Sequence, residues 1–191
     1  MTSTLFFSCL FIFLLSGCSL GIENIQKGYA LNSTEGVVVL SLTSSGECGW
    51  ALFVDIQRTD KPNKHTINMQ NTFEDRDWKR KSGECPSEKN DYSGTLAILA
   101  LPPGKYEIFQ ITGLSNHHTF YSKNDFSVPF DVSENAVTYL GNAHFFIEQY
   151  TYILDIFDNQ DRDLSLFKRQ HPQIPVQFII DILENATISD A

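Results

Sequence analysis

The chain is poor in positive charge. It has 14 lysine and arginine residues against 23 aspartate and glutamate residues, which gives a net charge of −9. Nucleic-acid-binding surfaces need lysine and arginine to neutralise phosphates, and docking on anionic lipid needs the same residues. The acidic balance therefore argues against a nucleic acid as partner and against attachment to a membrane through surface charge.

Patterns typical of catalysis and cofactor binding are also missing. The sequence has no G-x-S-x-G nucleophile elbow, no glycine-rich phosphate loop and no C-x-x-C pair. These absences argue against a hydrolase of the elbow type, a nucleotide site and a zinc–cysteine centre, respectively. We predict a non-catalytic protein without a cofactor or a bound metal.

The apolar run near the N-terminus is too short to span a membrane. Residues 5–15 (LFFSCLFIFLL) are eleven mostly apolar residues, whereas a spanning helix needs about 20. A run of this length predicts a signal peptide over residues 1–17. Residues 1–4 contain no lysine or arginine, which departs from the usual positive start. Two alternatives stay open: a true start upstream of Met1, and a buried core helix.

The residues that follow this run resemble the lipobox of bacterial lipoproteins at all four positions, Leu15, Ser16, Gly17 and Cys18. The resemblance implies that a signal peptidase recognises the first three residues, cuts after Gly17, and leaves Cys18 carrying a lipid. Several acyl chains, at about 0.8 kcal/mol per buried CH₂, make a stable anchor. Because residue 19 is serine and not aspartate, the same resemblance implies an outer-membrane protein that faces the periplasm.

Two cysteines remain after Cys9 is removed with the leader and Cys18 is acylated. Thiols outside the cytoplasm tend to oxidise, so Cys48 and Cys85 predict one disulfide. In the chain-entropy model such a bridge stabilises the fold by roughly 3–4 kcal/mol. The alternative is a pair of free thiols.

A period of two dominates the chain after residue 36. In residues 126–132 the alternation of apolar and polar side chains is complete. Pro129 lacks an N–H, so we expect that strand to lie at a sheet edge or to turn that nitrogen toward solvent. Residues 95–101 are apolar on both faces, which predicts a central strand. The strands predicted in this way are 37–43, 50–57, 65–70, 95–101, 105–112, 126–132, 136–147 and 150–157. About eight strands joined by short turns predict a mainly-β fold, an antiparallel β-sandwich of immunoglobulin-like or prealbumin-like type.

The predicted organisation has four parts. A signal peptide (1–17) and a lipidated tether (18–35) precede a β-sandwich domain (36–158) and a short helical extension (159–191). In the extension, a helix is expected over residues 161–170 with Asp161 as N-cap. A second helix is expected over residues 175–184, opened by Pro175.

A strand–turn–strand segment over residues 101–108 contains Pro103, Gly104 and Tyr106. It resembles the "l-x-P-G-x-Y-x-l" segment of transthyretin-like and carboxypeptidase-regulatory-like sandwiches, and also small exported lipoproteins of unassigned function. Residues 126–145 are similar to the strand pair that closes such domains. The resemblance implies a β-sandwich used for binding, positioning or folding, and it assigns no functional residue by position.

Histidines and acidic residues offer two metal hypotheses. His117 and His118 follow a loop-like stretch, so a metal site there is weighed against two exposed loop histidines; His65, His144 and His171 have no assignable place. Residues 158–163 (DNQDRD) superficially resemble a calcium loop, but Arg162 interrupts the ligand spacing and residue 169 is arginine where an EF-hand has glutamate. A polar strand-to-helix junction is the alternative.

Trp78 lies among charged residues on a predicted loop, where an aromatic side chain is a candidate contact for a partner. The alternative is a tryptophan folded back onto the domain. We therefore expect a lipid-anchored interaction or structural module with an envelope protein as partner. A small-ligand or metal-binding domain and an envelope hydrolase are the other hypotheses.

Overall fold

The structure is a computed structural model of the 191-residue chain. It describes residues 25–26, 28–46, 51–60, 66–71, 93–114, 119–122, 126–148, 151–174, 177–180 and 188–189. Several residues with predicted roles lie outside this part of the chain, so the predictions about them stay predictions. They are the cleavage site with Cys18, the Cys48–Cys85 pair, Trp78 and the His117-His118 pair. No helix among the described residues is long and apolar enough to cross a membrane.

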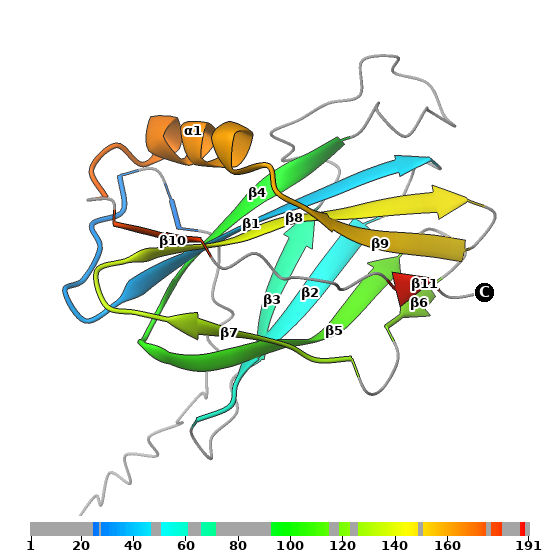
Figure 1. Ribbon diagram of the computed structural model, residues 1–191, viewed down its shortest axis with the longest axis horizontal. Coiled ribbons are helices and arrows are strands. Elements are labelled where there is room, and N and C mark those ends of the chain that lie inside the picture. Colours follow the sequence, from blue (N-terminus) through cyan, green and yellow to red (C-terminus); the bar gives the residue numbers. More distant parts are fainter. Residues whose placement is uncertain are drawn as a thin grey trace, which may run out of the picture.

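The described chain is mainly β and forms two sheets (Figure 1). Sheet A has the strand order β11-β9-β8-β1-β4, with β10 also paired to β8; its strands are β1 (Gly36–Gly46), β4 (Ser93–Leu101), β8 (Val137–Glu148), β9 (Thr151–Phe157), β10 (Phe178–Ile180) and β11 (Ile188–Ser189). Sheet B has the order β3-β2-β5-β6, with β7 also paired to β5; its strands are β2 (Ala51–Arg58), β3 (Thr66–Asn71), β5 (Gly104–Leu114), β6 (Thr119–Tyr121) and β7 (Val128–Val132). The helix α1 (Gln160–Gln170) lies against one side of sheet A.

All eight strands predicted from the sequence are present, and the short strands β6, β10 and β11 were not predicted. The expectation of a purely antiparallel fold is wrong for sheet A, because β8 pairs in parallel with both β1 and β10. The chain leaves β1, builds sheet B, and returns beside β1 only at β8. So long a connection can bring a strand back in the same direction, which a tight hairpin cannot do. Every pairing within sheet B is antiparallel.

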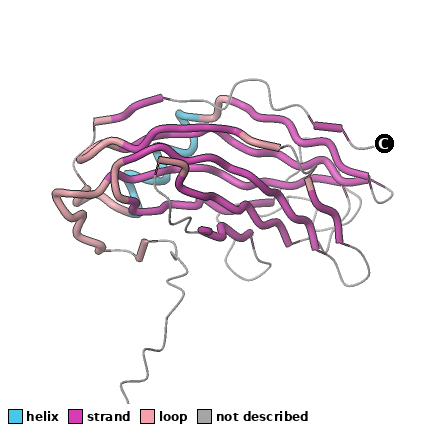
Figure 2. The backbone as a smooth tube through the Cα atoms, turned by 90° about the horizontal axis from the view of Figure 1, so that it is seen from below, coloured by secondary structure: helices cyan, strands magenta, loops and turns pink. Residues whose placement is uncertain are grey.

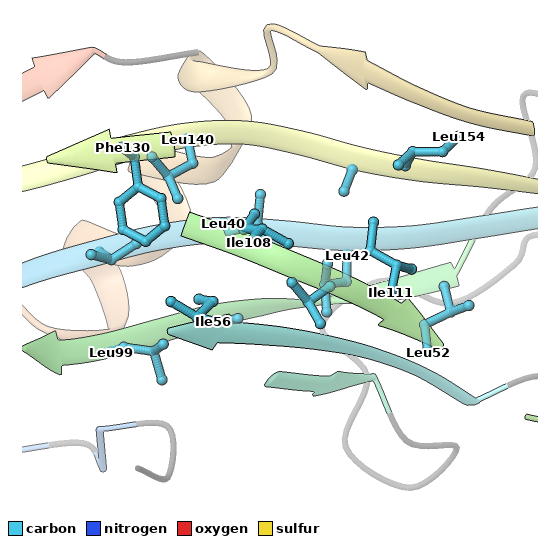
Figure 3. Packing of buried hydrophobic residues seen from close by; sticks show 14 of the residues in the cluster. Leu40, Leu42, Leu52, Ile56, Leu99, Ile108, Ile111, Phe130, Leu140 and Leu154 are labelled. Carbon is cyan, nitrogen blue, oxygen red and sulfur yellow. The ribbon is translucent and has the colours of Figure 1, made fainter. Parts of the chain in front are cut away.

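The main core lies between the two sheets, as the close view in Figure 3 shows. On β2, residues Leu52, Val54 and Ile56 are fully buried and the residues between them are partly exposed, which is the predicted period of two. From β1 the side chains of Leu40 and Leu42 pack against them. In the view of Figure 2 the strands run along the length of the molecule.

Strand β4 is not central as predicted, because it is the edge of sheet A among the described strands. Both of its faces are nevertheless buried. Ala97 and Leu99 face the main core, whereas Leu96 and Ile98 belong to a second apolar cluster. That cluster includes residues of α1, so a covering helix, and not a central position, explains the two apolar faces. The edge position predicted from Pro129 is confirmed, because β7 pairs only with β5 among the described strands.

The C-terminal region agrees with the predictions in part. The predicted helix over residues 161–170 is present as α1, but its N-cap is Asn159, and Asp161 lies in the first turn. The second predicted helix is wrong where the structure describes it, because Phe178–Ile180 is strand β10 and pairs with Val137–Tyr139 of β8. The edge of β8 offers backbone hydrogen bonds to this apolar, β-branched segment. These hydrogen bonds outweigh the helix-like spacing of apolar residues on which the prediction rested.

Part of the segment predicted as a tether lies on the domain. The Ile25 N–H donates to the Ile98 carbonyl oxygen over 2.9 Å, and the Asn135 N–H donates to the Glu35 carbonyl oxygen over 2.9 Å. Ile25 and Leu31 also pack against the second apolar cluster. Among the described residues, the N-terminal segment therefore contacts the domain from residue 25 onward.

Candidate functional site

The outer face of sheet A, the face that carries α1, has an apolar half and a polar half. The apolar half is the second cluster; its fully buried or nearly buried members are Val37, Val39, Leu96, Ile98, Val137, Tyr139, Leu164, Phe167 and Ile174. Further along β1 and β8 the buried side chains become polar. We call this group the polar row; its members are Ser41, Thr43, Ser45, Asn142 and His144. The polar row is the candidate site because buried polar groups require specific partners.

A bulge places the β8 half of the polar row on this face. The register of β1 with β8 shifts from Val39 opposite Tyr139 to Ser41 opposite Asn142, so β8 contains one extra residue. Gly141 in that interval has a φ of 103°, a backbone conformation that favours glycine. Because of the extra residue, Asn142 lies on the same face as Tyr139 although the two are three positions apart.

His144 is hydrogen-bonded through both ring nitrogens. Its Nδ1 lies 2.8 Å from Thr43 Oγ1, and its Nε2 lies 2.8 Å from Ser45 Oγ. Thr43 Oγ1 donates its single proton to Asn142 Oδ1 over 2.9 Å. Assigned from this network, Nδ1–H donates to Thr43 and Nε2 accepts from the Ser45 hydroxyl.

A buried carboxylate joins the polar row to α1. Asp163 is fully buried, and its Oδ2 accepts from Ser41 Oγ over 2.6 Å and from the Tyr139 hydroxyl over 2.8 Å. Its Oδ1 accepts from Arg162 Nε over 2.7 Å. The Tyr139 oxygen in turn accepts from the Asn159 N–H at the start of α1 over 3.2 Å. These bonds attach the first turn of α1 to sheet A.

Burial raises the pKa of Tyr139 far above its ordinary value, and the neighbouring Asp163 carboxylate raises it further. The hydroxyl is therefore protonated at neutral pH and donates to Asp163. This protonation state matches the role that the geometry assigns to it.

The chemistry open to this site is limited by burial. Ser45 and His144 have the spacing of a nucleophile and its base, but Ser45 is completely buried and His144 is 4% exposed. The second nitrogen of His144 bonds a hydroxyl, where the Ser-His-Asp template has a carboxylate. The arrangement is suited to holding two strands and a helix together, because its polar atoms bond one another.

The calcium hypothesis has no geometric support. Residues 158–162 line a shallow depression, but both carboxylate oxygens of Asp158 bond Gln160, one to its N–H and one to its side-chain amide, each over 3.1 Å. Asp163 points instead into the protein, where it bonds Ser41. Nowhere in the described residues do three His, Cys, Asp or Glu side chains lie close enough to hold a metal ion.

The proline–glycine turn before β5 is packed by Arg58. The guanidinium donates to the Pro103 carbonyl oxygen and lies 5.6 Å from the centre of the Tyr106 ring, while the Tyr106 hydroxyl donates to Pro102 O over 2.8 Å. A Cβ at Gly104 would lie 2.4 Å from the Arg58 side chain. The residues of this motif therefore shape a turn, and glycine is needed there for close approach.

Sequence reasoning did not find the polar row. Ser41 and Thr43 alternate with the apolar residues Leu40 and Leu42 on β1, and Ser44 and Ser45 follow as a polar pair; both patterns ordinarily indicate exposure to solvent. His144 and His171 had no assignable place, and the structure buries both. The bulge at Gly141 gave one usable signal, an isolated glycine inside a strand pattern.

Comparisons with known proteins add no family. No protein-family model matches the chain, and no curated protein matches it. A leucine-rich repeat protein from Bacteroides thetaiotaomicron is a structural match at 16% sequence identity and a TM-score of 0.33, over 61% of this chain. The chain spans only 14% of that protein's length. A likeness of this size supports no inference about fold type or function.

Proposed function

We propose that this protein is a lipoprotein anchored through Cys18 in the outer membrane, facing the periplasm, and that its domain is a non-catalytic interaction or structural module of the cell envelope. The observation that supports this most is the sequence Leu15-Ser16-Gly17-Cys18 at the end of a short apolar run. We further propose that the two sheets form an immunoglobulin-like or prealbumin-like sandwich related to the transthyretin-like domains.

The short path from anchor to domain supports a role close to the membrane. Ile25, which contacts the domain through its backbone N–H, lies seven positions after Cys18 in the chain. At about 3.5 Å per residue, this segment spans at most about 25 Å. The domain would therefore stay near the bilayer surface, within reach of membrane-bound partners.

Exposed apolar side chains at one end of sheet B support partner binding. Tyr121 on β6 is 58% exposed and Leu114 on β5 is 45% exposed. Because Thr112 is opposite Tyr121, and Leu114 is two residues from Thr112, the two apolar side chains lie on the same face of the sheet. Tyrosine is among the residues enriched in protein interfaces.

The test is in-cell crosslinking of the tagged full-length chain, with mass spectrometry of the crosslinked proteins. We expect a specific envelope protein that is lost in Tyr121→Ser or Trp78→Ala. Phe157→Ser is the matched control, because Phe157 is an aromatic residue of comparable exposure, 41%, on β9 of the other sheet. Equal capture by wild type and both variants would refute this contact surface, and turnover of a defined substrate by the purified chain would refute a non-catalytic role.

A further inference from the structure

His171 follows the last residue of α1 and is buried without a full set of partners. It is 3% exposed, and its Nδ1 is the buried side-chain nitrogen or oxygen atom that has no hydrogen-bond partner among the described residues. Its ring stacks on Phe167 with centroids 5.7 Å apart. A buried imidazolium would have to donate from this nitrogen, so protonation would leave an unsatisfied charged donor.

His171 closes α1 onto the second apolar cluster. Its backbone N–H donates to Phe167 O over 2.8 Å, and its carbonyl oxygen accepts from the Ile174 N–H over 3.2 Å. Phe167 and Ile174 are buried members of the cluster, and Phe178 of β10 packs against it. The His171 ring stacks on Phe167, and Phe167 meets Phe178 edge-to-face with ring centroids 6.3 Å apart, so the histidine ring is linked through Phe167 to both α1 and β10.

No described anion is placed to stabilise a charged His171. On α1, Lys168 and Arg169 are cations of the same turn, and both are exposed. Strands β4 and β10 contain no charged or histidine residue, and the ionisable side chains of β8 other than Tyr139 are His144 and Glu148, in its second half. In the N-terminal segment, the Tyr29 hydroxyl donates to Glu35 over 2.8 Å. Burial lowers the pKa of His171 below its ordinary value.

The same region holds the segment that leads to the proposed anchor. The Gln173 side chain donates to the Tyr29 carbonyl oxygen over 2.9 Å. Ile25 and Leu31 pack against the same cluster as Phe167. Residues 25–35 are thus attached to the outer face of sheet A through contacts that include the turn after His171.

We propose that His171 is an acid-sensitive latch whose protonation favours release of the last turn of α1, of β10 and of residues 25–35 from the outer face of sheet A. The consequence for the membrane rests on the proposed function. Release of residues 25–35 would lengthen the free tether by about 35 Å, at about 3.5 Å per residue. The domain would then reach further from the bilayer in acid than at neutral pH.

The direction of the effect follows from linkage. At pH 7.5 His171 is neutral in both the closed and the released state, so the closed state keeps its full stability. Below about pH 6.5, the ordinary histidine pKa, the released state takes up the proton first. The closed state therefore loses stability as the pH falls from about 6.5 toward the lowered pKa of the closed form.

The test is hydrogen exchange by mass spectrometry on the full chain purified from membranes, at pH 7.5 and pH 5.0, with rates corrected for intrinsic exchange. We expect peptides covering residues 25–35 and 160–180 to exchange at least tenfold faster at pH 5.0, while peptides from β2 and β5 do not change. His171→Phe and His171→Gln, which do not titrate, should both lose this acceleration. Two variants are used because each preserves a different property of the ring, its apolar packing or its polarity.

Several results would overturn the latch. The first is a wild-type exchange rate that does not change between pH 7.5 and pH 5.0. The second is faster exchange at pH 5.0 that persists in both variants. The third is equally faster exchange in β2 and β5, which would mean global unfolding. The mass of the N-terminal peptide in the same digest reports acylation of Cys18 separately. Acid-accelerated exchange that depends on His171, in a protein without a lipid on Cys18, would refute only the anchor. A lipid on Cys18 without this exchange would refute only the role of His171.

Discussion

The two described histidines lie on the same face of sheet A and are buried to nearly the same extent, 4% exposed for His144 and 3% for His171. They differ in their partners. Both ring nitrogens of His144 lie 2.8 Å from hydroxyl oxygens, whereas Nδ1 of His171 has no hydrogen-bond partner in the part of the chain that the structure describes. Burial alone therefore does not describe the two side chains: His144 belongs to a hydrogen-bonded network, whereas the missing partner of His171 is the ground on which we propose its sensitivity to protonation.

The helix is attached differently at its two ends, which extends the comparison. At its start, Asp163 accepts three hydrogen bonds, from Ser41, Tyr139 and Arg162. At its end the attachment is apolar and consists of Phe167 packed in the second cluster. The predictions below remove the two attachments in turn, starting with the largest expected effect.

Replacing Phe167 with alanine should have the largest effect. The side chain is fully buried, and truncating a buried phenylalanine costs about 4 kcal/mol through lost apolar contact and the cavity that remains. The free energy of unfolding from urea denaturation measures this loss. Ser165→Ala, at an exposed position of the same helix, should change it by less than about 0.5 kcal/mol. Equal effects at the two positions would mean that the apolar half contributes little.

Replacing Asp163 with alanine should cost about 3 kcal/mol, because three donors lose a buried charged acceptor. The matched control is Asp161→Ala, which removes an exposed carboxylate in the same first turn. Its loss should be about 0.5 kcal/mol, the size of a helix-dipole effect. If both variants melt at the same temperature, the polar attachment of α1 is not needed for stability.

Replacing His144 with leucine should cost about 2 kcal/mol, because the hydroxyls of Thr43 and Ser45 then lose their shared partner. Thermal unfolding followed by circular dichroism gives the change. Thr43→Val should lower the melting temperature less in the His144→Leu background than in the wild-type protein, because the hydrogen bond between Thr43 and His144 is already absent there. Strict additivity of the two changes would contradict the hydrogen-bonded row.

Replacing Tyr139 with phenylalanine should have the smallest effect, about 1 kcal/mol. The ring stays in the apolar half while the bonds to Asp163 and to the Asn159 N–H are lost. Combined with Asp163→Ala, the change should be clearly smaller than the sum of the two single effects. A stability equal to that of wild type would show that this hydroxyl does not help to hold α1.

Local patterns predicted the strands well, because period two and turn residues act over a few positions. Pro129 indicated an edge strand correctly, and the break between the strands predicted over 126–132 and 136–147 is a turn, with Asn135 at a φ of 54°. The errors depend on partners that are distant in sequence. Strand β4 was taken as central because α1 covers its second face, and Phe178–Ile180 became a strand because the β8 edge was free to pair with it.

The candidate site was harder to predict than the fold. Burial of Ser41, Thr43 and Ser45 depends on what lies over β1, which no local pattern reports. The interaction of Asp163 with Ser41 joins residues 122 positions apart. An acidic residue in the first turn of a helix ordinarily indicates favourable placement near the helix dipole, so nothing in the sequence distinguished Asp163 from the exposed Asp161.

The central claim is that this domain is anchored to a membrane by a lipid on Cys18. The most direct test is the mass of the N-terminal peptide of the full-length protein recovered from the membrane fraction of a bacterial host. The account predicts a peptide that begins at Cys18 and carries a diacylglycerol, and it predicts that Cys18→Ser abolishes the lipid and moves the protein out of the membrane fraction. A peptide that begins at an unmodified Met1 would contradict the account.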